Sequence, residues 1–275
     1  MTDRTSSAAS RFLWYLPVLA IVAFFSFPLI WVLMTAFKTR VDVFADPPKF
    51  AFSPTLDNYR RVFDGPFPDA LRNSVIIAIV SALGSVVLGT LTAYGFSRYK
   101  FRGQDNLLFW ILSLRMLPVI AVIVPYFILF RRVGLDDTLL SLMLVYAIFN
   151  ISFSVWLLKG FFDEVPREME EAAKMDGYGP WGVFFRVAFP MVIPGIATAT
   201  VFNIIQTINE FLLAFVLTQR EATTAPVALL NFLTPLGLDW GGISAAASML
   251  VAPVIVFAIL VRKHLIRGMS FGQLE

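Results

Sequence analysis

Six long segments with almost no charge dominate the pattern of hydrophobic and polar positions along the chain. They cover residues 12–37, 74–96, 107–130, 138–158, 187–218 and 241–261. The third segment contains Arg115 and the fifth contains Glu210, and the other four carry no charge. Because a helix needs about 20 consecutive apolar residues to cross a bilayer, the pattern predicts six transmembrane helices. The expected fold class is an all-α polytopic membrane protein.

The composition of the 275 residues supports a membrane environment. Apolar residues make up 58% and charged residues 15%, with a mean hydropathy of +0.75, whereas soluble domains carry about 25% charged residues. The chain has no cysteine, which excludes disulfides, thiolate metal sites and a cysteine nucleophile. Its Lys and Arg residues are scattered between the apolar segments, so the sequence predicts no nucleic-acid partner.

The first apolar segment is interpreted as a retained membrane anchor. Arg4 and Arg11 precede it, as basic residues precede a secretory signal peptide. The segment is longer than the apolar core of a signal peptide, however, and it runs directly into Lys38 without a small-residue cleavage site.

Six spans place both chain ends on the same side of the membrane. With both ends in the cytoplasm, the basic clusters at 98–102 and 262–267 are also cytoplasmic, where loops are usually more basic. The expected organisation is a cytoplasmic tail at 1–11, a first transmembrane helix at 12–37, an external loop at 38–73, a transmembrane domain at 74–261 that contains a cytoplasmic loop at 159–186, and a cytoplasmic tail at 262–275.

Part of the cytoplasmic loop, residues 166–176, is expected to form a short helix. Pro166 suits the first turn of a helix. Two pairs of opposite charge lie four residues apart, Arg167 with Glu171 and Glu170 with Lys174. Gly177 is placed to end the helix, because glycine adopts the left-handed conformation of a helix C-terminus without strain.

The stretch GYGPWG at 177–182 matches the glycine spacing of a dinucleotide-binding turn. Such a turn requires a strand before the glycines and a helix after them. A predicted helix rich in carboxylates precedes them instead, so no nucleotide site is expected. Pro180 is expected to start a second short helix that ends before Pro190 and Pro194, since proline lacks the N–H group that a helix interior requires.

A longer spacing pattern runs through the same loop. EAA at 171–173 is followed after three residues by Gly177, and after nine more by VAFP at 187–190. This pattern resembles the EAA loop of bacterial ABC importer permeases, with Val187 and Phe189 in place of the usual Ile and Leu. In that family the loop forms coupling helices that dock into a cleft on the ATP-hydrolysing subunit. The resemblance implies that the coupling residues are Glu170, Glu171, Ala172, Ala173, Asp176, Gly177 and Pro190.

Shorter stretches resemble the carbohydrate branch of the same family, to which the smaller maltose-importer permease belongs. They are PPKF at 47–50, SPTLDNY at 53–59, NEFLLA at 209–214, TAPVA at 224–228 and IRGMS at 266–270. Ile208 stands where that branch usually has Trp. Together these stretches imply the type I ABC importer permease fold, a bacterial inner-membrane location, and import of a sugar or polyol by alternating access.

The chain is expected to be a transport subunit and not an enzyme. It contains no Gly-Lys dipeptide, so it lacks the phosphate-binding P-loop of an ATPase. The resemblance implies that a separate ATPase dimer uses ATP and Mg²⁺, and that this chain itself holds no cofactor or metal. It also implies a second permease subunit, an external solute-binding protein and membrane lipid as partners.

Polar residues in the fifth segment suggest where a substrate could pass. Asn203, Gln206 and Glu210 fall on one stripe of a helix, with Thr207 beside them. Polar and charged residues inside a membrane usually face a cavity or a partner. One hypothesis is that the stripe lines the pathway and binds sugar hydroxyls. The other is that Glu210 lies near the outer interface or pairs with another subunit.

Two further features are expected to be structural. Arg115 lies close enough to the cytoplasmic interface for its side chain to reach the polar headgroups. Small residues repeat every four positions in the second segment, at Ser81, Ser85, Gly89 and Ala93. Such a repeat is typical of tight packing between membrane helices.

Other functions remain as alternatives at this point. A permease for a non-sugar solute would share the EAA loop. An integral-membrane enzyme would need a catalytic cluster, but His264 is the only histidine. A membrane scaffold would not need a polar stripe.

Overall fold

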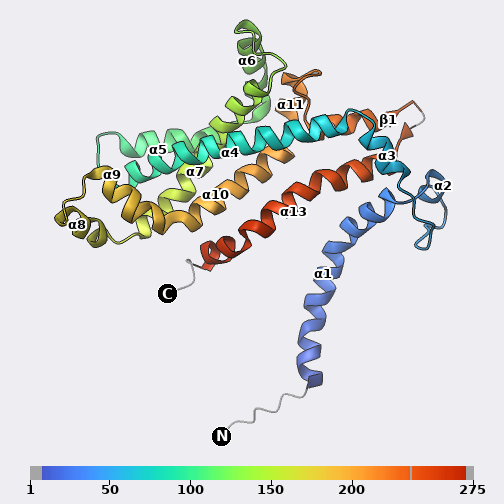
Figure 1. Cartoon of the computed structure of the whole chain (residues 1–275), viewed down its shortest axis with the longest axis horizontal. Helices are drawn as coiled ribbons and strands as arrows, with labels where there is room; N and C mark the ends of the chain where they lie inside the picture. The colour runs from blue at the N-terminus through green and yellow to red at the C-terminus, as the bar shows by residue number, and fades with distance from the viewer. Residues whose placement is uncertain (1–7, 236, 271–275) are drawn as a thin grey trace. The chain divides into compact units, whose positions relative to one another are not determined.

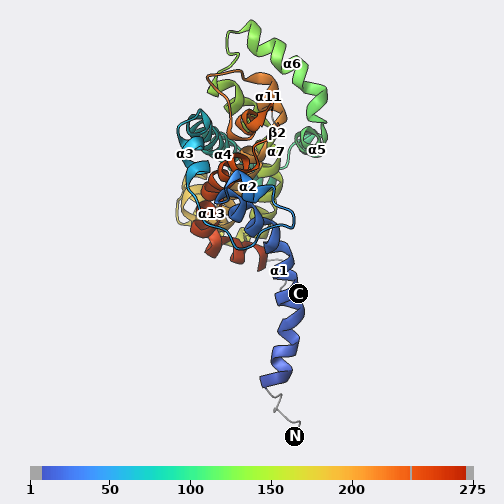
Figure 2. The same cartoon turned by 90° about the vertical axis from the view of Figure 1, so that its right-hand side faces the viewer.

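The computed structural model describes the backbone of residues 8–235 and 237–270, which form two compact units. One unit combines Met1–Phe67 with Leu229–Val251, and the other combines Pro68–Ala228 with Ala252–Glu275. Both are built mainly of helices, as the hydrophobic pattern predicts (Figures 1 and 2). Residues 1–7 and 271–275, which belong to the two predicted cytoplasmic tails, lie outside the described residues.

The first unit joins a long apolar helix to several short elements. Its elements are α1 (Ala8–Ala36), α2 (Arg40–Val43), α3 (Asp57–Phe63), η3 (Leu229–Phe232), the antiparallel strands β1 (Leu233–Thr234) and β2 (Gly237–Leu238), and the start of α13 (Trp240–Ser270). Buried Asn58 fastens the end of α1, because its amide donates to the carbonyl oxygens of Ala36 at 2.9 Å and Lys38 at 2.8 Å. Arg61 pairs with Asp239, just before α13, at 3.0 Å.

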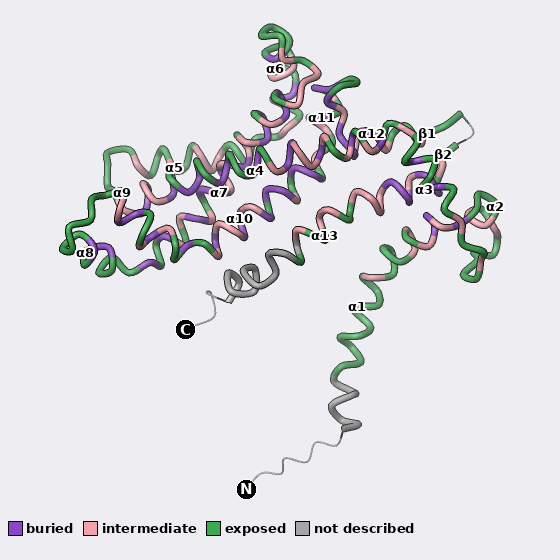
Figure 3. The backbone as a smooth tube through the Cα atoms, in the orientation of Figure 1, coloured by how far each residue is buried: buried purple, intermediate pink, exposed green. Residues whose placement is uncertain are grey.

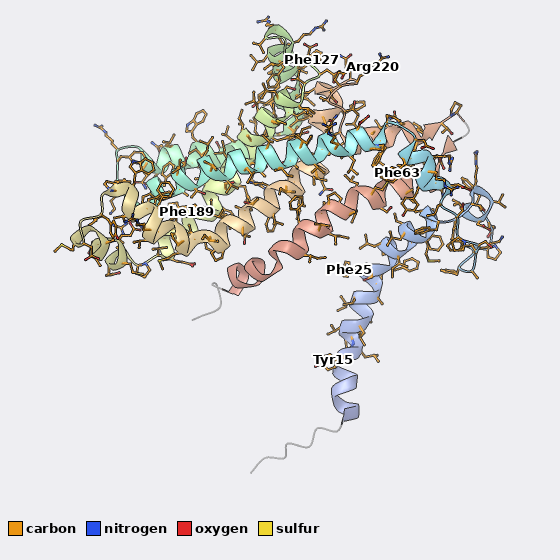
Figure 4. The ribbon with its side chains drawn as sticks, viewed as in Figure 1. Tyr15, Phe25, Phe63, Phe127, Phe189 and Arg220 are labelled. Carbon is orange, nitrogen blue, oxygen red and sulfur yellow. The ribbon has the colours of Figure 1, made fainter. Side chains whose placement is uncertain are left out.

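Helix α1 exposes apolar side chains on all sides. It contains an 18-residue window with a mean hydropathy of 2.4 in which no residue is buried, and residues 15–30 are almost entirely exposed in Figure 3. Tyr15 and Phe25 both project away from the helix axis (Figure 4). A helix that is apolar all round is typical of a segment surrounded by lipid or by other membrane helices.

The second unit is built on three long helices that lie side by side, α4 (Phe67–Arg98), α7 (Leu139–Glu164) and α10 (Phe189–Asn209) (Figure 1). The other elements of the unit are α5 (Gln104–Ser113), η1 (Leu114–Met116), α6 (Val119–Arg132), α8 (Arg167–Met175), α9 (Pro180–Val183), η2 (Phe184–Ala188), α11 (Leu212–Leu217), α12 (Ala225–Ala228) and the rest of α13. Buried residues follow the facing sides of the three long helices (Figure 3).

Helices α4 and α7 come into close contact at Gly89. A Cβ atom at this position would lie 2.4 Å from the Cβ of Ser154, so a larger residue would push α7 away. The four small residues of the predicted seam, Ser81, Ser85, Gly89 and Ala93, are all buried. The prediction that they form a helix-packing surface is therefore confirmed.

Among the described residues, five helices are long and apolar enough to cross a membrane, and the count rises to six if one bent pair is a single span. The bent pair corresponds to the third predicted segment, 107–130. It is not one continuous helix, because α5 with η1 meets α6 at 93°. Leu117 at the bend is extended, with ψ of 122°. The ring of Pro118 explains this conformation, since a residue before proline is sterically driven out of the helical region.

The second loop helix does not end before Pro190, and this sequence expectation is wrong. Pro180–Asn209 is one helical segment, in which α9 passes through the π-helical turn η2 into α10. A π turn bonds each residue to the fifth one along, so the bulge directly before Pro190 accommodates its missing N–H group. The fifth predicted span, 187–218, is also interrupted, because Glu210 is extended between α10 and α11.

Asp137 fastens the link between α6 and α7 to the segment after α11. Its carboxylate accepts hydrogen bonds of 2.8 to 3.2 Å from four consecutive backbone N–H groups, those of Gln219, Arg220, Glu221 and Ala222. Burial raises the pKa of Asp137, but the four hydrogen bonds together outweigh burial and hold the pKa below its ordinary value. Asp137 therefore acts as a charged clasp between two connecting segments.

Candidate functional site

The chain between α7 and α10 forms the helix-turn-helix that the sequence predicts, called here the α8–α9 loop (residues 166–183). Helix α8 ends at Gly177, which has a positive φ of 87°. The N–H of Gly177 donates to the carbonyl of Lys174 at 3.0 Å, and the N–H of Tyr178 donates to that of Ala173 at 3.1 Å. These two bonds are the usual closure of a helix at a left-handed glycine, so the predicted role of Gly177 in ending the helix is confirmed.

The α8–α9 loop does not have the framework of a nucleotide site. Helix α8 lies before Gly177, where a dinucleotide-binding turn requires a strand. Within the described part of the chain, no group of three or more His, Cys, Asp or Glu side chains is placed to hold a metal ion. A cavity of about 350 Å³ lies between this loop and α4, lined among others by Arg98, Glu171 and Tyr178.

Helix α8 has two different faces. On one face Glu170 and Ala173 are buried, with 3% and 6% of their surface exposed. The opposite side, called here the outward face of α8, consists of exposed residues: Glu171, Ala172, Met175 and Asp176. The structure thus separates two groups among the predicted coupling residues, one packed against the chain itself and one free to meet a partner.

Glu170 forms a buried ion pair with Arg98 at the end of α4. The Nε of Arg98 donates to Oε1 of Glu170 at 2.6 Å, and the two side chains are only 8% and 4% exposed. The hydroxyl of Tyr94 donates to the other oxygen, Oε2, at 3.0 Å. Both carboxylate oxygens of Glu170 therefore have partners within the chain.

The remaining donors of Arg98 bind the backbone directly after α7 and the neighbouring serine of α4. One terminal nitrogen donates to the carbonyl of Val165 at 3.0 Å and the other to the hydroxyl of Ser97 at 2.8 Å. Ser97 in turn donates to Asp163 at 2.6 Å. A buried charge is tolerated when its hydrogen-bonding capacity is met in this way.

An aromatic cluster packs beside this ion pair. The ring of Tyr94 lies 4.9 Å from that of Phe184 in η2 and 5.3 Å from that of Phe162 in α7. Phe184 also contacts Phe189, 5.9 Å away at the start of α10. Pro190, the last of the predicted coupling residues, is exposed in the first turn of α10 and lies next to this cluster along the chain rather than on the outward face of α8.

The polar stripe of α10 is divided between the interior and an open surface. Asn203 is buried, and its amide donates to the hydroxyls of Ser85 at 3.1 Å and Ser154 at 2.8 Å. Thr207 is buried and accepts a hydrogen bond of 3.0 Å from Asn150. Gln206, by contrast, is exposed. Asn203 and Thr207 therefore join α10 to α4 and α7, and Gln206 faces outward.

Glu210 lies at the break between α10 and α11. Its carboxylate accepts hydrogen bonds from the Tyr146 hydroxyl at 2.7 Å and from the backbone N–H groups of Leu213 at 3.0 Å and Ala214 at 3.4 Å. A carboxylate in this position satisfies N–H groups that the first turn of a helix leaves unpaired. Within this chain, Glu210 therefore shapes the start of α11.

A cavity of about 510 Å³ opens beside this break. Its polar lining consists of Arg115, Tyr146, Asn150, Gln206, Thr207, Asn209 and Glu210. The guanidinium of Arg115 lies 4.8 Å from the ring centre of Phe153, a favourable cation–π distance. Three of the four predicted pathway residues, Gln206, Thr207 and Glu210, thus share one cavity, whereas buried Asn203 does not line it.

The sequence did not single out several residues of these sites. Arg98 is interpretable only as a membrane flank from its position, because its partner Glu170 is 72 residues away. Tyr146 carries no local signal for its contact with Glu210. Arg115 was noted in the sequence, but only as a structural residue near the cytoplasmic interface, whereas the structure places it in the lining of the cavity beside Glu210.

Comparison with known proteins identifies the family. Residues 85–271 match the family described as binding-protein-dependent transport system inner membrane component. The chain is 34% identical to a probable ABC transporter permease of Sinorhizobium fredii, over 100% of this chain and 99% of the relative. It is 34% identical to a trehalose transport system permease of Mycobacterium tuberculosis, with 93% and 94% covered. A trehalose/maltose transport system permease of Thermococcus litoralis is 30% identical, with 90% and 91% covered.

Solved structures share the fold. A chain of a bacterial ABC transporter involved in the import of the acidic polysaccharide alginate aligns with a TM-score of 0.76 at 21% identity, covering 96% of this chain and 100% of that one. A chain of a bacterial alginate ABC transporter in complex with a pentasaccharide-bound periplasmic protein aligns with a TM-score of 0.69 at 16% identity, covering 94% and 96%. The chain therefore belongs to the binding-protein-dependent transport system inner membrane components, the permease subunits of ABC transporters.

Proposed function

We propose that this permease imports a sugar or polyol and that a partner ATPase drives it through the outward face of α8. The observation that carries the proposal is the division of the EAA segment, which leaves Glu171 and Ala172 exposed beside the glycine that ends α8. Small side chains allow a close approach by another backbone, and an exposed carboxylate offers a partner for Arg or Lys. The outward face of α8 has both properties.

In this mechanism the α8–α9 loop and both chain ends are cytoplasmic. An ATPase dimer binds ATP and Mg²⁺ and closes, and the outward face of α8 follows that closure. The movement turns the permease between inward-facing and outward-facing states, as alternating access requires. This chain supplies the docking surface and part of the pathway, and the partner supplies the hydrolysis.

The cavity beside Glu210 is the proposed part of the substrate pathway in this chain. Gln206 offers an exposed amide that suits sugar hydroxyls, which both donate and accept hydrogen bonds. Asn203 and Thr207 serve the pathway indirectly, because their side chains hold α10 against its neighbours. Glu210 contributes by fixing the break between α10 and α11.

A saccharide is the favoured substrate class because named relatives carry trehalose, maltose and alginate. An external solute-binding protein is a further proposed partner, since one structural relative was solved with a periplasmic protein. A second permease subunit is proposed as well, because the family resemblance implies it. An importer of a non-sugar solute is the alternative. Uptake of radiolabelled disaccharides, amino acids and phosphate by cells expressing the complete transporter separates the two.

Charge reversal at the outward face of α8 tests the ATPase-docking proposal. We expect Glu171→Arg to abolish recovery of the ATPase with the tagged, detergent-extracted permease, because the substitution replaces an exposed anion with a cation at the proposed interface. Asp64→Arg is the matched control, because it reverses another exposed carboxylate at the end of α3. It should retain the ATPase. Equal recovery with Glu171→Arg and with the unaltered chain would contradict docking through this face.

A further inference from the structure

We propose that Arg98 and Glu170 are positioning residues that make α4 follow the movement of α8, and that Glu170 is not part of the ATPase-docking surface. This inference rests on the proposed function, because it concerns how a displacement of the α8–α9 loop reaches the membrane helices. It assigns different tasks to two adjacent glutamates of one segment.

The orientation of the two carboxylates is the first support. Glu171 is exposed, whereas Glu170 is buried and has both oxygens bonded, one to Arg98 and one to Tyr94. A partner could bind Glu170 only by displacing these contacts. The buried carboxylate is therefore suited to hold α8 to its own chain.

The second support is the position of the ion pair in the chain. Helix α8 follows α7 after only two residues, but it has no covalent connection to α4 at this point. Its polar contacts with α4 include the pair between Glu170 and Arg98, the bond of 3.0 Å from Tyr94 to Glu170, and a hydrogen bond of 3.1 Å from Arg167 to the carbonyl of Ser97. The ion pair is the shortest of these contacts and is almost completely shielded from water, so salt screens it little.

The third support is that Arg98, at the end of α4, binds two other parts of the chain at once. It donates to Glu170 of α8 and to the carbonyl of Val165, directly after α7, and it also donates to Ser97 of its own helix. The planar guanidinium fixes the directions of these bonds. A displacement of α8 therefore either carries α4 with it or breaks several charged hydrogen bonds together.

The test uses the complete transporter, with the unaltered chain, the Arg98→Gln and Glu170→Gln variants, and the double variant. Three quantities are measured: recovery of the ATPase, ATP hydrolysis, and the movement of α4. Movement is followed by the rate of thiol labelling of a cysteine introduced at Val87, an exposed residue of α4, with and without a non-hydrolysable ATP analogue. The natural absence of cysteine from this chain makes the label specific to it.

We expect both single variants to retain the ATPase and its hydrolysis. The ATP-dependent change in the labelling rate should be about tenfold smaller than in the unaltered chain, which is within the usual range of coupling between sites. The double variant leaves no unpaired buried charge, so it guards against loss of folding. Its ATP-dependent change in labelling should be no smaller than that of either single variant. Tyr94→Phe is the matched control, because it removes one hydrogen bond to Glu170 and keeps the ion pair. It should retain the change in labelling.

Two results would overturn the inference. If Glu170→Gln loses the ATPase as Glu171→Arg does, Glu170 belongs to the docking surface. If labelling at position 87 still responds to ATP in the double variant, the ion pair only packs α8 and transmits nothing. Failure of the proposed function is recognised separately, because the unaltered permease would then recover no ATPase at all.

Discussion

Individual polar residues of α10 have different tasks although they share one stripe of the helix. Asn203 donates two hydrogen bonds inside the protein, whereas Gln206 is exposed at a cavity. The orientation of each side chain relative to α4 and α7 decides which task it has. Substitution of the two residues should therefore affect different measurements.

Asn203→Ala should lower the free energy of unfolding by about 1–2 kcal/mol, because it removes two hydrogen bonds between membrane helices. The thermal unfolding midpoint of the detergent-extracted chain measures this effect. Gln206→Ala should leave the midpoint nearly unchanged and instead reduce uptake of whichever sugar the unaltered transporter carries. Destabilisation by both variants to the same extent would argue against a pathway role for Gln206.

Asp137 should make stability depend on pH at the acidic end. Its pKa is lower in the folded protein than in the unfolded chain, so its stabilising contribution is complete above the unfolded pKa of about 4. The contribution is lost as the pH falls through the folded pKa, because the protonated carboxyl accepts hydrogen bonds weakly. Below pH 4 the thermal unfolding midpoint of the unaltered chain should decrease, and that of Asp137→Asn should decrease less. An identical decrease in both proteins would rule out the hydrogen bonds of Asp137 as its cause.

At the scale of helices, the contact between α4 and α7 depends on a residue without a side chain. Gly89→Ala should destabilise the protein by about 1–3 kcal/mol, because the added methyl group would overlap Ser154 and force the helices apart. Gly84→Ala is the matched control in the same helix, since no atom lies within 4 Å of the added Cβ. It should be neutral or slightly stabilising, as alanine favours a helix. Unfolding midpoints that fall equally in both variants would contradict a specific contact at Gly89.

Local sequence signals predicted elements better than they predicted contacts. Gly177 ends α8 as expected, because its tolerance of positive φ is a property of the residue itself. The proline rule failed at Pro190, where a π turn absorbs the missing N–H group. The pairing of Arg98 with Glu170 was not predictable, because the partners are distant in sequence and meet only when α4 and α8 pack. The coupling role of the seven candidate residues stays a prediction, and which of them are buried and which are exposed required the structure.

At the scale of the whole chain, the open cavity beside Glu210 favours a transporter with a further subunit. The residues of this chain line the cavity but do not enclose it. A pathway through a membrane must be enclosed, since polar groups exposed to lipid are costly. A second permease subunit is the proposed component that encloses it.

Uptake should therefore require more than this permease and its ATPase. Cells that express only these two proteins should show no ATP-dependent sugar uptake above background, and adding the second permease should restore it. Transport of radiolabelled sugar into the cells measures the result, and recovery of each tagged protein in the membrane is the control. Full uptake without the second permease would mean that two copies of this chain form the pathway.

The different orientations of Glu170 and Glu171 have a consequence for redesigning the transporter. Successive residues of an α-helix point about 100° apart, so neighbours in sequence belong to different surfaces. A hybrid permease that borrows a foreign ATPase therefore needs only the outward residues of the donor loop, grafted at 171, 172, 175 and 176. Transplanting the whole segment would also introduce a donor residue at position 170 that is not adapted to pair with Arg98.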